Sequence, residues 1–271
     1  TGVWVRLPPS AQMMGKNSLL FLGTSAGWPL PRLGCHCKIC SSKDSRDKRL
    51  RPAILINKQV LIDAPPDIYH QLQKNKINPS QISHIFITHA HDDHIMGLYD
   101  LGHIYNRPQK IRLISTSGVL SLIRKKMGIS LLAFEVQEAK TFQKITLARE
   151  TPYWFIPVQH GKMETSGIKI KNPKPIFYAP EFRRILPSSR KSLSDLELLI
   201  IDGSSKTSLG QARGHETIEQ GIKVAKELRA KRILFTNIGH KTDSHSQLEV
   251  FVKERGDRRF AIAFDGLEIK L

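Results

Sequence analysis

The chain has 271 residues, of which 40% are hydrophobic and 24% are charged, an ordinary globular composition with ample length for a packed core. Lys and Arg number 42 against 24 Asp and Glu, and the formal net charge of +18 attracts nucleic acid, phosphorylated small molecules or acidic membranes. No apolar run approaches the roughly 20 residues that span a bilayer, which excludes an integral membrane protein. Three cysteines within six positions exclude a disulfide framework.

Residues 1–13 show no clear period and are followed by a further methionine at Met14. We expect an added or disordered extension over residues 1–13 and a single domain over residues 14–271. In the first half of that domain, short apolar runs predict strands and amphipathic runs predict helices. The expected strands lie at 18–23, 52–57, 59–64, 84–88 and 111–115, and the expected helices at 67–76, 95–105 and 119–126.

The second half repeats this alternation of strand-rich blocks and helices. Ile218, Ile222, Ala225 and Leu228 recur at helical spacing and predict an amphipathic helix over 217–230. Two similar halves predict an α/β fold in which two sheets are sandwiched between outer helices. The remaining expected strands lie at 133–136, 144–148, 153–158, 168–170, 175–178, 197–201, 232–236 and 260–264, with a last helix at 246–253.

The segment from His89 to His94 follows the strand expected at 84–88 and carries three histidines and two aspartates. Such a run is difficult to pack in a core, because adjacent imidazoles repel when charged and are costly to bury when neutral. A metal ion resolves the conflict, since neutral imidazoles and carboxylates are common ligands. The spacing points His89 and His91 in one direction and turns Asp93 and His94 toward a second position.

The sequence from Thr88 to His94 resembles the HxHxDH signature of the metallo-β-lactamase superfamily, and the resemblance covers roughly residue 18 to the C-terminus. It implies an α/β fold of the four-layer αββα sandwich type, with a metal pair at one edge of the sheets. It also implies a later His and a later Asp, each after a strand. His160 and Asp202 meet these two requirements.

The resemblance implies two divalent metal ions at the active site, Zn²⁺ or Mn²⁺. In the family pattern His89, His91 and His160 hold one ion, Asp93 and His94 hold the other, and Asp202 bridges the two. Asp93 is accordingly expected to be a catalytic residue as well as a ligand.

Cys35, Cys37 and Cys40 have C-x-C-x2-C spacing, and three thiolates need a fourth ligand to complete a tetrahedral structural zinc site. Residues 22–40 are similar to the N-terminal region of the phosphodiesterase family of the carbon–phosphorus lyase pathway, where a late histidine completes such a site. This resemblance implies that His240 is the fourth ligand of a structural Zn²⁺. Reduced, zinc-bound cysteines favour a cytoplasmic location.

The family pattern places one more catalytic imidazole where this chain has Asn237. Because a carboxamide oxygen is a weaker zinc ligand than imidazole, we expect Asn237 to be a weak or absent ligand. Three alternatives stay open for the second ion position. The ion is held loosely, or it is a harder ion such as Mn²⁺, or the position recruits His245.

His215 precedes the helix expected at 217–230, and the resemblance implies that it acts on the leaving group or the phosphate. Imidazole suits this catalytic work because its pKa lies near neutrality. Between Lys171 and Lys191, Glu181 is the single acid in a basic stretch, which either binds phosphate or forms a solvated loop. The basic residues there are Lys171, Lys174, Arg183, Arg184, Arg190 and Lys191.

Together these features predict a metal-dependent phosphodiesterase in which a metal-bound hydroxide attacks a small diester, with a cyclic ribose phosphate as one candidate. An RNA-processing nuclease of the same fold is an alternative, as is an esterase, thioesterase or lactonase. A third alternative, motivated by Asn237, is a member with weakened catalysis that binds a phosphorylated ligand. The expected partner is a small phosphorylated substrate, with nucleic acid and a homodimer left open and no membrane.

Overall fold

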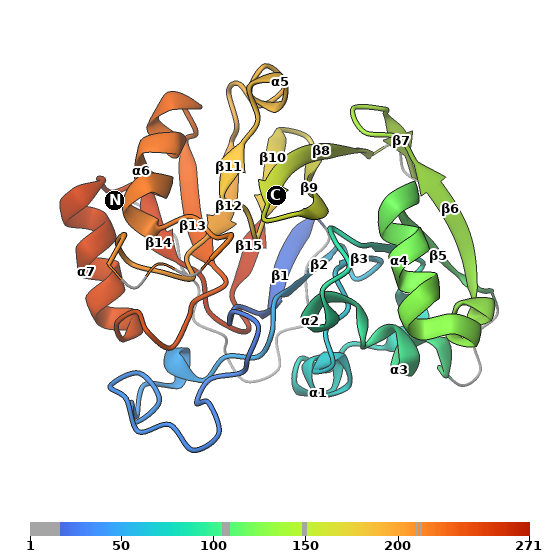
Figure 1. The fold of residues 1–271 in the computed structure, drawn as a ribbon, viewed down its shortest axis with the longest axis horizontal. Coiled ribbons are helices and arrows are strands. Elements are labelled where there is room, and N and C mark those ends of the chain that lie inside the picture. Colours follow the sequence, from blue (N-terminus) through green and yellow to red (C-terminus); the bar gives the residue numbers. More distant parts are fainter. Residues whose placement is uncertain (1–16, 105–108, 148–150, 210, 212) are drawn as a thin grey trace.

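The computed structural model describes residues 17–104, 109–147, 151–209, 211 and 213–271, so the expectation for residues 1–13 lies outside the described part. Two β-sheets face each other, and helices cover their outer faces (Figure 1). This arrangement is the expected four-layer αββα sandwich. None of the helices in the described ranges is long and apolar enough to cross a membrane.

The first sheet has seven strands in the order β15-β1-β2-β3-β4-β5-β6. The pairs from β15 to β3 are antiparallel, whereas β3, β4, β5 and β6 run parallel. The strands are β1 (Ser18–Gly23), β2 (Ala53–Ile56), β3 (Val60–Ile62), β4 (His84–Phe86), β5 (Ile111–Thr116), β6 (Phe134–Ala139) and β15 (Glu268–Lys270).

The second sheet has the order β11-β8-β9-β10-β12-β13-β14, with β7 paired to β8. Strands β10, β12, β13 and β14 run parallel. The strands are β7 (Ile145–Thr146), β8 (Pro152–His160), β9 (Met163–Lys171), β10 (Pro175–Ala179), β11 (Arg184–Ile185), β12 (Leu198–Asp202), β13 (Arg232–Thr236) and β14 (Phe260–Ile262).

The helices differ from the expected pattern in two places. The segment expected as a helix at 95–105 forms two short helices that meet around Gly97, and a further short helix lies at Pro187–Arg190, where none was expected. The helices are α1 (Ile68–Lys74), α2 (Asp92–Ile95), α3 (Leu98–Gly102), α4 (Ser117–Met127), α5 (Pro187–Arg190), α6 (Ile218–Glu227) and α7 (His245–Arg255). Short 3₁₀ turns lie at η1 (Ser45–Asp47), η2 (Pro79–Gln81) and η3 (Gly128–Ala133).

Three apolar clusters fill the spaces between the four layers. The two-residue period of the strands explains how one strand contributes to two clusters. In β1, Leu19 and Phe21 join the cluster between the sheets, while Leu20 and Leu22 join the cluster under the outer helices. Alternate residues of a strand point to opposite faces, so one short apolar strand can serve two layers. Each such side chain contributes about 1.5–3 kcal/mol when fully buried, so this patterning stabilises the sandwich.

Candidate metal centre

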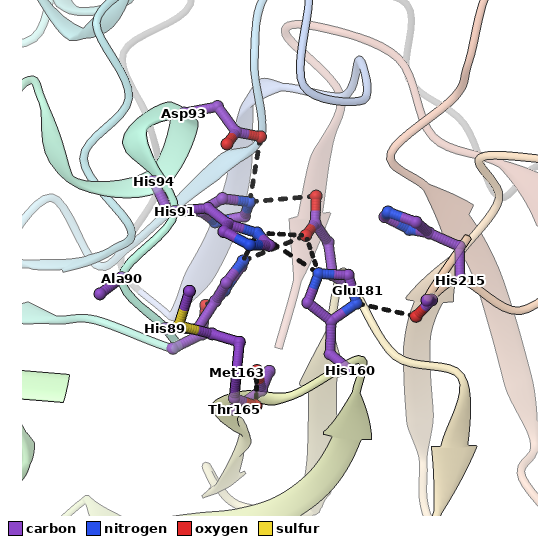
Figure 2. A network of polar contacts seen from close by, with 12 residues as sticks. His89, Ala90, His91, Asp93, His94, His160, Met163, Thr165, Glu181 and His215 are labelled. Carbon is purple, nitrogen blue, oxygen red and sulfur yellow. Dashed lines mark hydrogen bonds and ion pairs between the residues drawn. The ribbon is translucent and has the colours of Figure 1, made fainter. Parts of the chain in front are cut away.

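Loops at one edge of the two sheets bring together side chains from distant parts of the chain (Figure 2). The segment His89–His94 follows β4, His160 ends β8, Glu181 follows β10, and Asn237 follows β13. The carboxyl ends of parallel strands are the usual place for a site in an open α/β sheet. Since β4 belongs to the first sheet and β8, β10 and β13 to the second, the groups meet where the ends of the two facing sheets come together.

Four ligand atoms of His89, His91, His160 and Glu181 form a compact group. Nδ1 of His91 lies 3.0 Å from Nε2 of His89 and 3.3 Å from Nε2 of His160. Oε2 of Glu181 lies 3.1 Å from Nε2 of both His89 and His160, and 3.6 Å from Nδ1 of His91. Ligands about 2.0–2.1 Å from a tetrahedral Zn²⁺ are about 3.3 Å from one another. The group thus has the size of a metal coordination shell.

The outward-facing ring nitrogens of two of these histidines have other partners. Nδ1 of His160 donates to the carbonyl oxygen of Gly214 over 2.8 Å, and Nδ1 of His89 lies 3.0 Å from Oγ1 of Thr88. Metal-binding histidines usually donate their second N–H in this way, which leaves the other nitrogen free for the ion. Burial, together with the charge of His94, lowers the pKa of His89 to about 4, so this ring is neutral and able to bind a metal.

A second group contains Asp93, His94 and the other carboxylate oxygen of Glu181. Nε2 of His94 lies 3.3 Å from Oε1 of Glu181 and 3.6 Å from Oδ2 of Asp93. Nδ1 of His94 is bound to Oδ2 of the fully buried Asp63 at 2.9 Å. Within the described part of the chain, Nε2 of His94 is buried without a hydrogen-bond partner. An unpartnered imidazole nitrogen beside two carboxylates fits a second ion position.

Glu181 belongs to both groups and carries a charge. Burial opposes ionisation, but the positive His94 and the imidazoles of His160, His89 and His91 that face its carboxylate hold the pKa of Glu181 well below its usual range. Its two oxygens face different groups, which is the geometry of a bridging carboxylate. The sequence contained one signal for this residue, since Glu181 is the single acid of a basic stretch and follows a buried strand at the correct edge.

The structure differs from the expectation for Asp202, which lies in neither group. Its Oδ1 accepts a hydrogen bond from the backbone N–H of Ser204, and its Oδ2 accepts one from Nδ1 of His215, each over 2.8 Å. The backbone N–H of Phe182 also points at Oδ2, at 3.4 Å. The oxygens of Asp202 are therefore used inside the protein, and Glu181 stands where Asp202 was expected.

The ring of His215 lies beside the metal-ligand groups (Figure 2), with its centroid 4.8 Å from that of His160. Burial disfavours a charged imidazole, but the carboxylate of Asp202 outweighs burial and raises the pKa of His215 to about 9. His215 is therefore a proton donor at neutral pH, and Asp202 fixes which of its nitrogens faces the site.

Asn237 and His245 were the open alternatives for the second ion position, and they lie in different places. Nδ2 of the fully buried Asn237 donates to Oε1 of Glu181 over 3.3 Å, so Asn237 touches the site. Nδ1 of His245 lies 3.0 Å from the guanidinium of Arg49, in a separate buried network that includes Asp47. The ring of His245 is thus engaged away from the ligand groups.

The structure brings together the four residues expected to hold the structural ion, and their ligand atoms all lie within 4.8 Å of one another. Sγ of Cys35 lies 3.5 Å from Nδ1 of His240, the separation expected between a thiolate and an imidazole nitrogen on one zinc ion, about 3.5 Å. The backbone N–H of Cys37 and the ring of His240 lower the pKa of Cys35 to about 6, which favours the thiolate that binds metal. The remaining member, Cys40, is buried.

The basic stretch divides between ion pairs and the site. Lys174 pairs with Glu197, and Arg190 pairs with Glu227, away from the ligand groups. Arg183 lies two residues after Glu181, and its Nη1 donates to the carbonyl oxygen of His215 at 3.3 Å and pairs with Oε1 of Glu216 at 3.4 Å. One guanidinium of the stretch is therefore held at the candidate centre.

Comparisons with known proteins support the family resemblance of the sequence. The family described as "Beta-lactamase superfamily domain" matches residues 58–238. Among solved structures, a diphosphatase from the PhnP family superposes with a TM-score of 0.82 at 26% identity, over 94% of this chain and 97% of that one. The sequence motifs of the chain imply a resemblance to the same group of enzymes.

Two relatives by sequence have other names. An octanoyltransferase from Porphyromonas gingivalis is 29% identical over 267 residues, which cover 92% of this chain and 50% of that protein. The chain thus spans half the length of that relative. A ribonuclease Z from Methanocaldococcus jannaschii is 32% identical over 126 residues, which cover 42% of this chain and 39% of that protein.

Proposed function

The chain belongs to the β-lactamase superfamily, and we propose that it is a metal-dependent phosphodiesterase of that superfamily that hydrolyses a small phosphorylated substrate. One observation carries this proposal. Two groups of metal-ligating atoms share the carboxylate of Glu181, and a protonated His215 lies directly beside them. The arrangement combines water activation, charge neutralisation and a proton source in one place.

We assign one ion to His89, His91, His160 and Oε2 of Glu181. The second ion is assigned to Oε1 of Glu181 and to Asp93 and His94, with Asn237 beside them. When bound, two divalent ions activate water for attack and neutralise charge on the phosphate. The unpartnered Nε2 of His94 and the coordination-sized group around His91 support this assignment.

His215 is proposed to donate the proton that the reaction requires. As the oxygen of water bonds to phosphorus, the ester P–O bond breaks and the departing oxygen needs a proton. His215 carries one at neutral pH because Asp202 raises its pKa, and general acids of this kind contribute about 10²–10⁴-fold to a rate. The products are a phosphomonoester and an alcohol, and water returns the proton to the imidazole.

The charge of the protein supports an anionic substrate. The formal net charge of +18 raises the local concentration of anions near the chain. Arg183 presents a guanidinium at the centre, and such groups bind phosphate oxygens through two parallel hydrogen bonds. The name of the structural neighbour, a diphosphatase, points to the same class of substrate.

An RNA-processing nuclease is the second candidate, and the ribonuclease Z relative together with the net charge favours it. The same ligands and the same proton donor serve both reactions, so the two candidates differ in substrate size. Acyl transfer, which the name of the Porphyromonas gingivalis relative suggests, is not carried over, because the match covers half of that protein.

The experiment compares three substrates on protein that has been stripped of metal and reloaded with Zn²⁺ or Mn²⁺. These are bis(p-nitrophenyl) phosphate, p-nitrophenyl acetate and an oligoribonucleotide, with Glu181→Gln as the control for contaminating activity. We expect turnover of the phosphodiester by the wild type alone. Hydrolysis of the acetate without the diester would overturn the proposal in favour of an esterase, and faster cleavage of the oligonucleotide would favour the nuclease.

A further inference from the structure

We infer that the two ion positions of this centre have different metal preferences: the position among three imidazoles takes Zn²⁺, and the position beside Asn237 takes a harder ion such as Mn²⁺. The inference rests on the two-ion centre proposed above and extends it. It depends on the donor atoms that this chain offers at each position and on one buried amide.

The donor sets at the two positions are unequal. The first position offers three imidazole nitrogens, from His89, His91 and His160, and one carboxylate oxygen. The second offers one imidazole nitrogen, from His94, and carboxylate oxygens from Asp93 and Glu181. Imidazole suits Zn²⁺, whereas carboxylate and carbonyl oxygens suit Mn²⁺ and Mg²⁺.

The side chain of Asn237 lies beside the second position and carries a further oxygen. Its side chain is fully buried, its Nδ2 donates to Oε1 of Glu181 over 3.3 Å, and its Oδ1 has no hydrogen-bond partner among the residues that the structure describes. A buried carbonyl oxygen without a partner costs about 1–3 kcal/mol. An ion at the second position gives the unpartnered Nε2 of His94 a partner, and it gives Oδ1 of Asn237 one when the amide is turned toward Glu181.

The orientation of the amide is compatible with this arrangement. The oxygen and nitrogen of an asparagine side chain are interchanged by a half-turn, so Oδ1 can take the place that Nδ2 occupies near Glu181. There it would face a carboxylate oxygen at the same separation of 3.3 Å, and two acceptors at that distance need a cation between them. An ion at the second position is such a cation.

The backbone at this position also permits a direct test. Asn237 has a φ of +61°, in the left-handed region that Asn, Asp and His adopt more readily than other side chains. Replacement by His or Asp therefore changes the donor atom without forcing a residue into a conformation that it avoids. Asp is also close to Asn in size, so it serves if the larger His does not fit the buried site.

The experiment measures metal occupancy directly. Metal-free wild-type protein is equilibrated with increasing ratios of Mn²⁺ to Zn²⁺, and the bound metals are counted by mass spectrometry, with the Mn²⁺ electron paramagnetic resonance signal as a second readout. Because Zn²⁺ binds most nitrogen and oxygen sites more tightly than Mn²⁺, a roughly hundredfold excess of Mn²⁺ is included. We expect the ion beside Asn237 to exchange to Mn²⁺ at a Mn²⁺:Zn²⁺ ratio at least tenfold lower than the ratio needed for the other two ions. At that lower ratio, the ion among the three imidazoles and the structural ion stay Zn²⁺.

The variants identify the residue responsible. Asn237→His should move the exchange to Mn²⁺:Zn²⁺ ratios at least tenfold higher. Asn237→Asp should leave one Mn²⁺ bound at the wild-type ratio or below. Asn75→Asp, the same change far along the chain, should match the wild type. Equal exchange at both positions, exchange of Asn237→His at the wild-type ratio, or loss of the bound Mn²⁺ from Asn237→Asp would overturn the inference. Protein that retains only the structural zinc would instead refute the proposed centre itself.

Discussion

Nδ1 of His215 donates a hydrogen bond of 2.8 Å to Oδ2 of Asp202, a carboxylate that has no solvent exposure. We propose that this contact gives Asp202 a positioning and electrostatic role toward His215 instead of the bridging role that the sequence suggested. Both residues lie at the same edge of the sheets as the candidate metal ligands. In the proposed reaction the pair supplies the proton donor, and the oxygens of Glu181 lie in the two ligand groups.

The first prediction concerns the pH dependence of the rate. A general acid works in its protonated form, so activity falls as pH rises through the pKa of His215, which Asp202 raises to about 9. Asp202→Asn removes the charge that raises this pKa, and the alkaline limb of kcat should move to lower pH. Asp195→Asn, an exposed carboxylate with the same chemical change, is the control. If the alkaline limb of Asp202→Asn stays at the wild-type pH, the contact with Asp202 does not set the pKa of the catalytic acid.

The second prediction concerns substrate binding. Arg183 is held at the centre by the carbonyl oxygen of His215, so Arg183→Met should raise KM for the phosphodiester about tenfold or more with a smaller effect on kcat. Arg184 is the adjacent exposed arginine in β11, and Arg184→Met should leave KM near the wild-type value. Steady-state kinetics give KM and kcat for both variants and show whether Arg183 binds the substrate directly. Equal effects would show that Arg183 acts through general charge alone.

The third prediction concerns the structural ion. Cys37→Ser should release one Zn²⁺ per chain and lower the melting temperature more than the activity per folded molecule, because structural zinc binding is coupled to folding. His36→Ser changes an exposed residue between Cys35 and Cys37 that is not in the ligand group, and it should keep the zinc. Elemental analysis and thermal melts provide the readouts. Unchanged zinc in Cys37→Ser would contradict a structural site there.

The fourth prediction concerns stability. Arg49 is 1% exposed and donates to Oγ1 of Thr24 and to the carbonyl oxygen of Ala263, with His245 as a further partner. Arg49→Met should lower the free energy of unfolding by about 3–5 kcal/mol, because its buried hydrogen-bond partners are left unpaired and the nearby carboxylates of Asp265 and Asp47 lose a positive charge. Arg46→Met, which breaks a partly exposed pair with Asp44, should cost about 0–1 kcal/mol. Urea denaturation compares the two, and similar losses would contradict the difference.

Much of the fold could be predicted from local pattern. The strand expected at 232–236 is β13 with the same bounds, and the amphipathic spacing from Ile218 to Leu228 indicated α6. The order of the strands could not be predicted, because periodicity reports which face a residue occupies and not which strand is its neighbour. The short β11 and α5 were missed because they lie in a proline-containing basic stretch without clear period.

The candidate site shows the same division. The density of histidines from His89 to His94 and the spacing of the cysteines carried direct chemical information. The choice between Asp202 and Glu181 did not follow from sequence, since both acids follow buried strands at the same sheet edge. What separates them is that Asp202 is already bound to His215, whereas the longer side chain of Glu181 reaches both ligand groups.

Metal content per chain in Glu181→Gln and Asp202→Asn tests most directly which carboxylate joins the two ions. Each variant replaces a buried carboxylate by an amide of nearly the same size, so the comparison is matched. We predict that Glu181→Gln loses active-site metal and keeps the structural zinc, whereas Asp202→Asn keeps all three ions and retains a reduced, measurable activity. Loss of active-site metal from Asp202→Asn, with full occupancy in Glu181→Gln, would contradict the assignment of Glu181 as the bridging ligand.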